Sequence, residues 1–422
     1  LVAGAAVSAW WAATRQAGEA AAPSVAAVAR PSGPPLRVGI LCSRTGTMAV
    51  SERPVLDGAL LAVEEINDQG GVLGRPLEAV TEDGQSDETV FAAKATKLIE
   101  QDHVAVLVGC WTSASRKAVK AVVEKHDHLL LYPVSHEGME LSENIVYGGS
   151  VPNQQILPAL KWCYGFLNKK RWFLVGSDSV YSHAAHAVVQ DEAKALGSEV
   201  VADAFLMPGS TDVDGVVSRI KATRPDLIVN TIAGDTNVAF FRALCRAGVC
   251  PDRTPALSFD VSEEELSGLT PREVVGHYSA GNYFQSLDSP ENQSFLRRVR
   301  ARFGPGRIVS DPMQTAYTLV HVWAQAVQAA GSADTHAVRA AIRGQQFDSP
   351  QGPVKIDPAT LYTIQVSRVG RIDADGHFQE VYLSPRPLVP EPFPASRSRE
   401  AWQQFLEDLH RNWGGRWMNG RS

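Results

Sequence analysis

The chain has 422 residues, of which 44% are hydrophobic and 20% are charged, a balance typical of a soluble globular protein. This length is too great for one ordinary core and suits two lobes with additional segments. The formal net charge of −6 provides no basic field that could hold nucleic acid, so we exclude nucleic acid as a partner.

The first 35 residues differ in composition from the rest of the chain. The opening stretch "LVAGAAVSAWWAA" is apolar, and no charge occurs before Arg15. It is shorter than the roughly 20 residues that cross a bilayer, and its Trp10–Trp11 pair resembles an interfacial anchor. A Pro/Ala-rich stretch follows. We therefore expect residues 1–35 to be the remnant of a membrane helix or signal peptide, followed by a flexible linker.

From residue 36 the chain alternates between short apolar runs and amphipathic segments. The apolar runs predict buried strands at 36–42, 77–83, 103–109 and 129–134. Apolar residues at helical spacing predict helices at 54–67, 88–101 and 115–127. This alternation predicts a parallel, doubly wound sheet.

The same pattern restarts near Val151 and predicts a second α/β unit. Its helices are expected at 155–168, 182–197, 211–224 and 236–248, and its strands at 171–178, 199–207, 226–232 and 255–261. Beyond Pro271 the pattern predicts a strand at 274–284, helices at 290–304, 311–331 and 334–344, and antiparallel strands at 352–357, 363–373 and 377–384. An amphipathic, peripheral helix is expected at 399–413.

Ligands of open α/β sheets bind beyond the carboxyl ends of the strands, so the residues that follow each strand are candidates for binding. In the first unit these are Trp111, Ser113, Tyr132, Val134 and His136; in the second they are Ser179, Tyr181, Thr231, Asp235 and Asp260. Aromatic rings, hydroxyls and helix-start amides from two facing units predict a cleft for a small polar ligand.

The motifs that mark common enzymes do not occur. The sequence has no G-x-S-x-G elbow, no Walker loop and no H-E-x-x-H, and its five cysteines form no C-x-x-C. Cys110 with His136 is the sharpest catalytic candidate, but Cys110 ends an apolar run and is expected to be buried. We predict no catalytic residue, no metal site and no cofactor. Cys245 and Cys250 flank a helix end and could pair.

Several longer stretches resemble one family. "GTMAVSE", "VGCWTSASRKAV", "LLYPVSHEGMELSENIVYGGSVPNQQ" and "DPMQTAYTLVHVWAQAV" are similar to type I periplasmic binding proteins, in the branch of urea and short-chain amide binders. The resemblance covers about residues 36–394. It implies an α/β fold of two lobes, each a doubly wound and mainly parallel sheet, with a three-segment hinge and closure around a ligand.

The resemblance also implies boundaries. The first lobe is expected at 36–150 with 285–348, the second at 151–284 with 349–385, and a C-terminal extension at 386–422.

Single binding positions follow from the same resemblance. The first-lobe aromatic and hydroxyl of the family match Trp111 and Ser113, and its tyrosine after the fourth strand matches Tyr132, with Val134 two residues further on. Its pair of second-lobe tyrosines falls on Ser179 and Tyr181, so one aromatic has become a hydroxyl. His136 stands where the family commonly has an aromatic, and Ser182-His183 stand where it often has Pro-Arg.

These positions suggest how a ligand is held. Trp111, Tyr132 and Tyr181 are expected to enclose a planar polar group, while Asp235 or Asp260 accepts a hydrogen bond from an amide nitrogen. We expect Trp111 and Tyr181 to face each other across the cleft. A histidine titrates near neutrality, so His136 predicts an affinity that depends on pH.

The expected function is that of an extracytoplasmic solute-binding protein. It captures a small polar ligand, such as urea, an amide or an amino-acid-like solute, for an ABC permease. The alternative is the ligand-sensing outer domain of a membrane-anchored receptor, for example a kinase, whose partner is its own transmembrane or signalling domain. Both place the chain in the periplasm or on the outer face of the cytoplasmic membrane, and the N-terminal stretch suggests a membrane tether.

Overall fold

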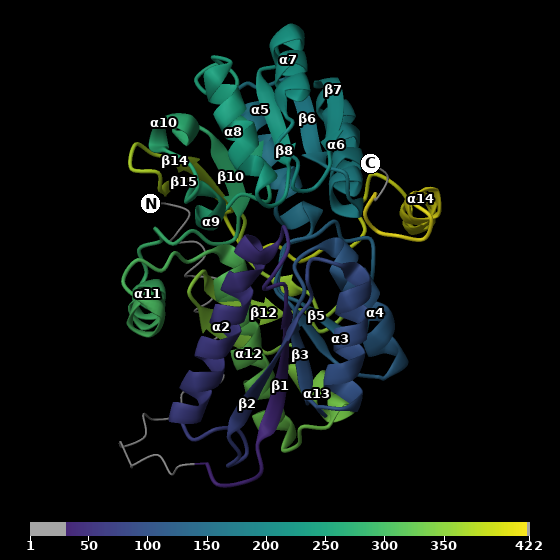
Figure 1. Ribbon diagram of the computed structural model, residues 1–422, viewed down its shortest axis with the longest axis vertical. Coiled ribbons are helices and arrows are strands. Elements are labelled where there is room, and N and C mark those ends of the chain that lie inside the picture. Colours follow the sequence, from purple (N-terminus) through teal and green to yellow (C-terminus); the bar gives the residue numbers. More distant parts are fainter. Residues whose placement is uncertain (1–30, 420–422) are drawn as a thin grey trace.

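The computed structural model describes residues 31–419, which form two α/β lobes, one above the other in Figure 1. The expectations for residues 1–30, namely the membrane-helix or signal-peptide remnant and most of the linker, lie outside the described residues. Within 31–419, no helix combines the length and apolar character needed to cross a membrane.

The first lobe is built on a parallel five-stranded sheet in the order β2-β1-β3-β4-β5. Its strands are β1 (Leu36–Cys42), β2 (Leu77–Asp83), β3 (Val106–Gly109), β4 (Leu130–Tyr132) and β5 (Ile145–Tyr147). Val38, Ile40 and Val108 have no exposed surface. Both faces of the sheet are covered, which explains why its strands appear in the sequence as nearly continuous apolar runs.

Helices from two distant parts of the sequence cover this sheet. They are α2 (Ala49–Asp68), α3 (Glu88–Glu100), α4 (Ser113–Lys125), α11 (Pro290–Phe303), α12 (Asp311–Ala330) and α13 (Thr335–Ile342). Helix α12 packs against α2, and α3 packs against α4 (Figure 1). Asp87 and Thr112 cap α3 and α4 with their side-chain oxygens, which sets where those helices begin.

The second lobe contains a seven-stranded sheet in the order β15-β14-β10-β9-β8-β6-β7. Its strands are β6 (Arg171–Ser177), β7 (Glu199–Leu206), β8 (Leu227–Thr231), β9 (Ala256–Ser258), β10 (Tyr278–Gly281), β14 (Arg368–Ile372) and β15 (Phe378–Leu383). Strand β14 is antiparallel to both of its neighbours, and the pairings from β10 to β7 are parallel. The doubly wound, mainly parallel sheets expected for both lobes are confirmed.

The helices of the second lobe begin with a short 3-10 turn, η1 (Pro152–Gln154). It is followed by α5 (Ile156–Gly165), α6 (Val180–Leu196), α7 (Asp214–Thr223), α8 (Thr236–Arg246), α9 (Glu263–Leu266) and α10 (Pro271–Val274). Cys245 and Cys250, which the sequence left open as a pair, are both free thiols.

Three segments connect the lobes, and hydrogen bonds tie them to one another. Ser150 Oγ donates to Asn282 Oδ1 at 2.7 Å, and Asn282 Nδ2 donates to the Val366 carbonyl at 2.6 Å. Gln365 Nε2 donates to the Gly148 carbonyl at 3.1 Å. The three segments therefore form one buried polar hinge, as the expected three-segment connection requires.

The expected boundary at residue 349 differs from the observed one. Strands β11 (Gln346–Ser349), β12 (Gly352–Ile356) and β13 (Thr363–Ile364) form a separate three-stranded sheet. Ile356 and Tyr362 belong to the core of the first lobe, so the chain crosses at 365–367. The single strand expected at 363–373 is split there, because Gln365 bonds to hinge groups instead of continuing a strand ladder.

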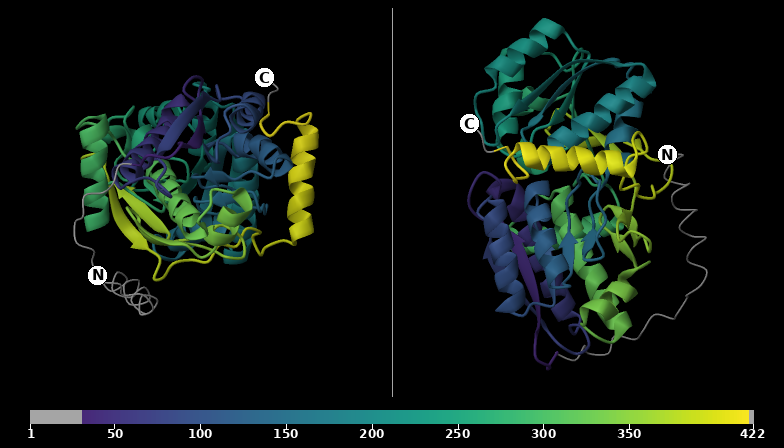
Figure 2. Two further views of the ribbon diagram at one scale, coloured as in Figure 1. Left: turned by 90° about the horizontal axis from the view of Figure 1, so that it is seen from below. Right: turned by 90° about the vertical axis from the view of Figure 1, so that its right-hand side faces the viewer.

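The C-terminal extension ends in helix α14 (Arg399–Asn412), close to its expected range. Its Trp402 is fully buried in a core cluster of the second lobe, and Arg397 forms an ion pair with Asp191 at 2.7 Å. Figure 2 shows α14 lying across the level at which the two lobes meet. The helix is thus fastened to the second lobe and is less peripheral than the sequence suggested.

Replacing Asn282 by alanine should destabilise the protein, because the Val366 carbonyl and the Ser150 hydroxyl both lose their buried partner. We expect a loss of about 1–3 kcal/mol in the free energy of unfolding, measured by urea denaturation. Gln101→Ala, at an exposed position, is the control and should change stability by less than about 0.5 kcal/mol. Equal effects of the two substitutions would contradict the proposed hinge.

Candidate ligand-binding site

The carboxyl ends of the two parallel sheets face each other across a cleft that has two adjoining parts. The acidic pocket is lined by Ser51, Trp111, Pro133, Val134, Ser135, Gln155, Phe259, Asp260, Val261, Ser262, Glu263, Glu265, Ser279, Ala280, Gly281, Tyr283, Phe284, Ser310, Asp311 and Pro312. The helix-start pocket is lined by Met48, Trp111, Thr112, Ser113, Ala114, Ser135, Ser177, Ser179, Val180, Tyr181, Pro208, Ala233, Asp260 and Met418. Trp111, Ser135 and Asp260 belong to both parts.

The acidic pocket is small in this conformation. The space open to the centre of a water-sized sphere is about 50 Å³, a few times the roughly 10–15 Å³ that one water needs. The lobes also touch beside it, because Ser51 Oγ of α2 donates to Glu265 Oε1 of α9 at 2.8 Å. The two lobes are therefore in contact in this structure, and the pocket between them is the size of a small molecule.

A tight turn presents Trp111 to the cleft from the first lobe. Strand β3 ends at Gly109, where a Cβ atom would lie 2.1 Å from the Leu41 carbonyl oxygen, so only glycine fits. Cys110 follows in the left-handed region with φ of 61°. Tyr132 then fixes the turn, because its hydroxyl donates to the Trp111 carbonyl at 2.8 Å. Tyr132 itself lines neither pocket and positions Trp111 from behind.

A buried ion cluster supports this wall. Arg116 of α4 has no exposed side chain and donates to Glu137 Oε1 at 2.8 Å and to Glu140 Oε1 at 3.0 Å. Lys117 adds contacts to the same two carboxylates at 3.2 and 3.0 Å. Burial alone would raise the pKa of Glu137, but Arg116 and Lys117 outweigh it and lower that pKa to about 2. The charges of this cluster are thus balanced internally.

Ser113 connects the ion cluster to the cleft. Its hydroxyl donates to Glu137 Oε2 at 2.5 Å and accepts from Arg116 Nη1 at 3.0 Å. Because the ion cluster occupies the hydroxyl, what Ser113 offers a ligand is the backbone N–H at the start of α4. The first N–H groups of a helix have no partner within the helix.

The second lobe contributes the opposite wall through the start of α6. The Ser179 side chain accepts from the Ser182 N–H and caps the helix. Tyr181 follows, with 8% of its surface exposed and a hydroxyl that has no hydrogen-bond partner among the described residues. Trp111 and Tyr181 therefore line the same pocket from different lobes, and that their rings face each other stays a prediction.

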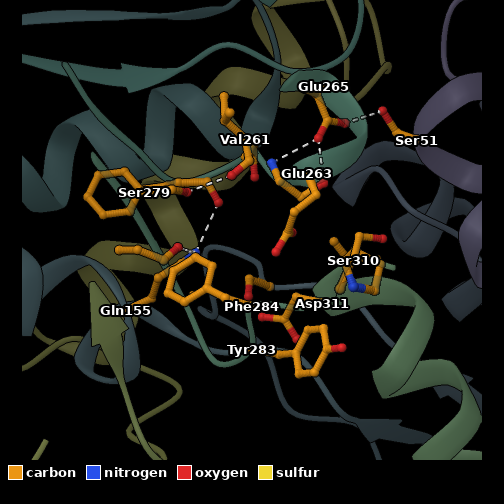
Figure 3. Close-up of a pocket in the computed structure, with 18 of the residues that line it drawn as sticks. Ser51, Gln155, Val261, Glu263, Glu265, Ser279, Tyr283, Phe284, Ser310 and Asp311 are labelled. Atoms are coloured by element: carbon orange, nitrogen blue, oxygen red, sulfur yellow. Dashed lines mark hydrogen bonds between the residues drawn. The ribbon is translucent and has the colours of Figure 1, made fainter. Parts of the chain in front are cut away.

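Two carboxyl groups in the cleft are buried without a counter-charge. Glu263, at the start of α9, is 5% exposed, and burial raises its pKa to about 8. Its Oε1 accepts from the Gln285 N–H at 2.7 Å, whereas Oε2 has no partner among the described residues. Figure 3 shows this side chain reaching into the open part of the pocket. Burial likewise raises the pKa of Asp260, whose buried Oδ2 is also unpartnered.

The other two carboxylates of the acidic pocket have partners. Glu265 accepts from Ser51 and from the Ser262 hydroxyl, the latter at 2.6 Å. Asp311, at the start of α12, accepts from the Asn282 N–H at 2.8 Å. Among the described lining residues of both pockets, none is lysine, arginine or histidine. The cleft therefore offers carboxyl groups, and no cationic side chain of the described lining, to whatever it encloses.

His136 lies inside the first lobe rather than at the cleft. Its ring stacks on those of Tyr147 and Tyr362, with centroids 5.2 and 5.6 Å away, and only 1% of the residue is exposed. Burial, with the nearby charge of Arg116, lowers its pKa to about 3. The expectation that His136 titrates near neutrality is therefore wrong, because a buried imidazole cannot easily acquire charge.

Some of the remaining predicted positions line the pockets, and others do not. Val134 lines the acidic pocket, and Ser179 and Tyr181 line the helix-start pocket. Thr231 is fully buried and bonded to His186 Nε2 at 2.9 Å, and Asp235 is exposed, so neither of these two lines the cleft. Burial also raises the pKa of the Cys110 thiol, so the thiolate, which is the reactive form, is disfavoured.

Several lining residues were missed by sequence reasoning. Glu263 comes three residues after Asp260 and could have been found by extending the strand-end rule into the next helix. Ser51 and Asp311 start helices of the first lobe, and Met418 comes from the C-terminal extension. No local signal marks these three, because only folding brings them to the cleft.

Comparison with known proteins agrees with this architecture. Residues 36–399 match the family model described as the periplasmic binding protein domain, and the chain belongs to that family. It is 25% identical over 335 residues to the Leu/Ile/Val-binding protein BraC3 of Rhizobium johnstonii, covering 76% of this chain and 86% of that protein.

Solved structures show the same fold at lower identity. A solute-binding protein of an ABC transporter from R. palustris, in complex with 4-hydroxybenzoate, has a TM-score of 0.75 at 23% identity and covers 83% of this chain and 97% of that one. The branched-chain amino acid transporter substrate-binding protein LivJ from Streptococcus pneumoniae, in complex with isoleucine, has a TM-score of 0.73 at 22% identity, covering 85% and 100%.

One curated relative has the name of an enzyme. The chain is 28% identical over 142 residues to the limonene hydroxylase of Geobacillus stearothermophilus, which covers 32% of this chain and 26% of that protein. Since about three quarters of that protein has no counterpart here, its activity does not transfer to this chain.

Replacing Arg116 by methionine should leave Glu137 and Glu140 buried without their main counter-charge. We expect a loss of about 3–5 kcal/mol in the free energy of unfolding at neutral pH. Arg37→Met, which breaks an exposed pair with Glu78, is the matched control and should cost at most about 1 kcal/mol.

The same cluster predicts acid sensitivity. Because the pKa of Glu137 is lowered from 4.5 to about 2 in the folded protein, its contribution is present above pH 4.5 and lost as the pH falls towards 2. Urea denaturation at several pH values measures the effect of the substitution and the effect of acid. If Arg116→Met is as stable as Arg37→Met, the ion cluster does not stabilise this wall.

Proposed function

We propose that this protein is an extracytoplasmic solute-binding protein that captures a small ligand bearing an ammonium group, of the amino-acid-like class, between its two lobes. It then delivers the ligand to an ABC importer, without chemical turnover. The family supports solute binding, and BraC3 and LivJ bind amino acids according to their names. The alternative of a receptor's outer domain stays a prediction that the described residues do not test.

The absence of positive charge from the cleft lining carries this proposal. Glu263 and Asp260 each keep one buried oxygen without a partner, and the described lining has no lysine, arginine or histidine. A buried carboxylate without a counter-charge is unfavourable, so a bound ammonium group stabilises the ionised form and is itself held by it. An ammonium group also supplies three donors for these acceptors.

The opposite end of the cleft suits the other polar end of such a ligand. Helices α4 and α6 both begin at the helix-start pocket, where the helix dipoles and the first N–H groups of α4 favour a carboxylate, whereas the Val180 N–H of α6 is bonded to the Trp417 carbonyl. Trp111 and Tyr181 lie beside these helix starts and provide apolar surface. Asp260 belongs to both pockets, so a short ligand can extend from the helix starts to the unpartnered carboxyl groups.

The charges also argue against two other ligand classes. A benzoate could place its carboxylate at the helix starts, but it has no ammonium group to offer Glu263 and Asp260. Urea is neutral and does not stabilise the ionised form of these two carboxyl groups. The expectation of urea or a simple amide therefore gives way, in our proposal, to an ammonium-bearing solute.

Replacing Glu263 by glutamine should weaken the binding of an ammonium-bearing ligand at least about tenfold, because a buried charged hydrogen bond is lost. L-leucine, putrescine, acetamide, urea and 4-hydroxybenzoate are suitable probes, measured by thermal shift and calorimetry. Glu273→Gln is the matched control, because Glu273 lies in the same lobe but pairs with Arg242 and lines neither part of the cleft. Tightest binding of urea or 4-hydroxybenzoate would refute the proposed ligand class.

The pH dependence of binding separates an ammonium from a neutral amide. With a pKa of about 8, Glu263 is mostly protonated at neutral pH in the free protein. An ammonium favours the ionised carboxylate, so binding releases a proton and affinity rises as the pH increases towards 8. An amide carbonyl needs the protonated carboxyl as donor, so its affinity falls above that pH. Calorimetry in two buffers of different ionisation enthalpy measures the released proton directly.

A further inference from the structure

Residues 413–419, here called the C-terminal strap, follow helix α14 and contact both lobes. They lie beyond residues 36–399, which match the family model. Figure 1 shows the yellow segment that follows α14 at the level where the two lobes meet. The strap is therefore a structural addition to the matched domain, located at the helix-start pocket.

The strap is joined to the second lobe by backbone pairing. The Val180 N–H donates to the Trp417 carbonyl at 3.1 Å, and the Asn419 N–H donates to the Asp178 carbonyl at 3.2 Å. Between these two bonds, Met418 forms an antiparallel bridge with Ser179. The strap thus pairs with the segment that begins α6 and forms one wall of the helix-start pocket.

The same residues also hold the first lobe. Arg416 Nε donates to Glu88 Oε1 at 3.2 Å, and the Trp417 N–H donates to Glu88 Oε2 at 3.2 Å. Arg416 lies 3.6 Å from Asp87, and the Lys117 ammonium lies 4.9 Å from the centre of the Trp417 ring. Helices α3 and α4 of the first lobe are thereby linked to α6 of the second.

Met418 reaches the ligand pocket itself. It lines the helix-start pocket together with Trp111 of the first lobe and Tyr181 of the second. A methionine side chain is flexible and apolar, and it adapts to the shape of what it covers. Its position completes the apolar surface that the two aromatic rings begin.

We propose that the C-terminal strap holds the two lobes together and that Met418 is a specificity-determining residue of the cleft. Because the strap is fastened to the second lobe, its contacts with α3 and α4 of the first lobe exist only while the lobes are close, so they favour the closed conformation. A protein that spends more time closed binds its ligand more tightly, because less of the binding energy is needed for closure. The role of Met418 rests on the proposed function, whereas the role of the strap in closure does not.

Interlobe distances test the closure without any ligand. Spin labels are placed on Val50→Cys, at an exposed position of the first lobe, and on the exposed native Cys250 of the second, with Cys245→Ser. Arg416→Glu puts a carboxylate against Asp87 and Glu88 and should lengthen and broaden the distance distribution. Arg411→Glu, in an exposed pair with Asp408 on α14, is the control and should not. Arg416→Gln removes the same contacts without repulsion and should act in the same direction.

If Arg416→Glu and the parent protein give the same interlobe distance distribution, the strap does not hold the lobes together. The same conclusion follows if Arg411→Glu changes the distribution as much as Arg416→Glu does. This outcome is independent of whether any ligand has been found.

Met418→Ala tests specificity with L-leucine and the larger L-phenylalanine as probes. Removing the side chain opens the wall, so the affinity for L-leucine should fall about tenfold relative to that for L-phenylalanine. Equal changes for both probes would overturn the role of Met418. If neither probe, nor putrescine, binds the parent protein, the proposed function fails and takes the role of Met418 with it. The distance measurements still decide the closure.

Discussion

The buried polar hinge is the constraint on which the rest of the molecule depends. Ser150, Asn282 and Gln365 tie together three segments that are far apart in the sequence. The side chains of one segment satisfy the polar groups of another, so the position of each segment depends on the other two. This arrangement sets how the lobes sit relative to each other and places the carboxyl ends of both sheets at one cleft.

The cleft and its support handle charge in opposite ways. Behind the wall of the first lobe, Arg116 and Lys117 balance Glu137 and Glu140 in a cluster of paired charges. In the cleft, Glu263 keeps an unpartnered oxygen, and burial raises its pKa. A paired cluster gives rigidity, whereas an unpaired carboxyl group remains available to a ligand. This difference points to Glu263, rather than to the better-bonded Glu137, as a recognition group.

The strand-end rule located much of the site, and its misses have physical reasons. Trp111, Ser179 and Tyr181 lie at the pockets because a parallel sheet directs every strand end to the same edge. His136 also follows a strand, but its ring turns inward and stacks with Tyr147 and Tyr362. The sequence shows that a residue follows a strand and does not show which way its side chain points.

By itself, the sequence determined the two α/β units, their parallel sheets and the helix at the C-terminal end. These follow from the periodicity of apolar residues, which is a local property of the chain. Only the tertiary structure decided that residues 346–364 belong to the first lobe, that Ser51 and Asp311 meet Glu263 at the acidic pocket, and that Met418 lines the helix-start pocket. Such contacts join residues that lie far apart in the sequence, and no local pattern encodes them, because they depend on how whole lobes pack.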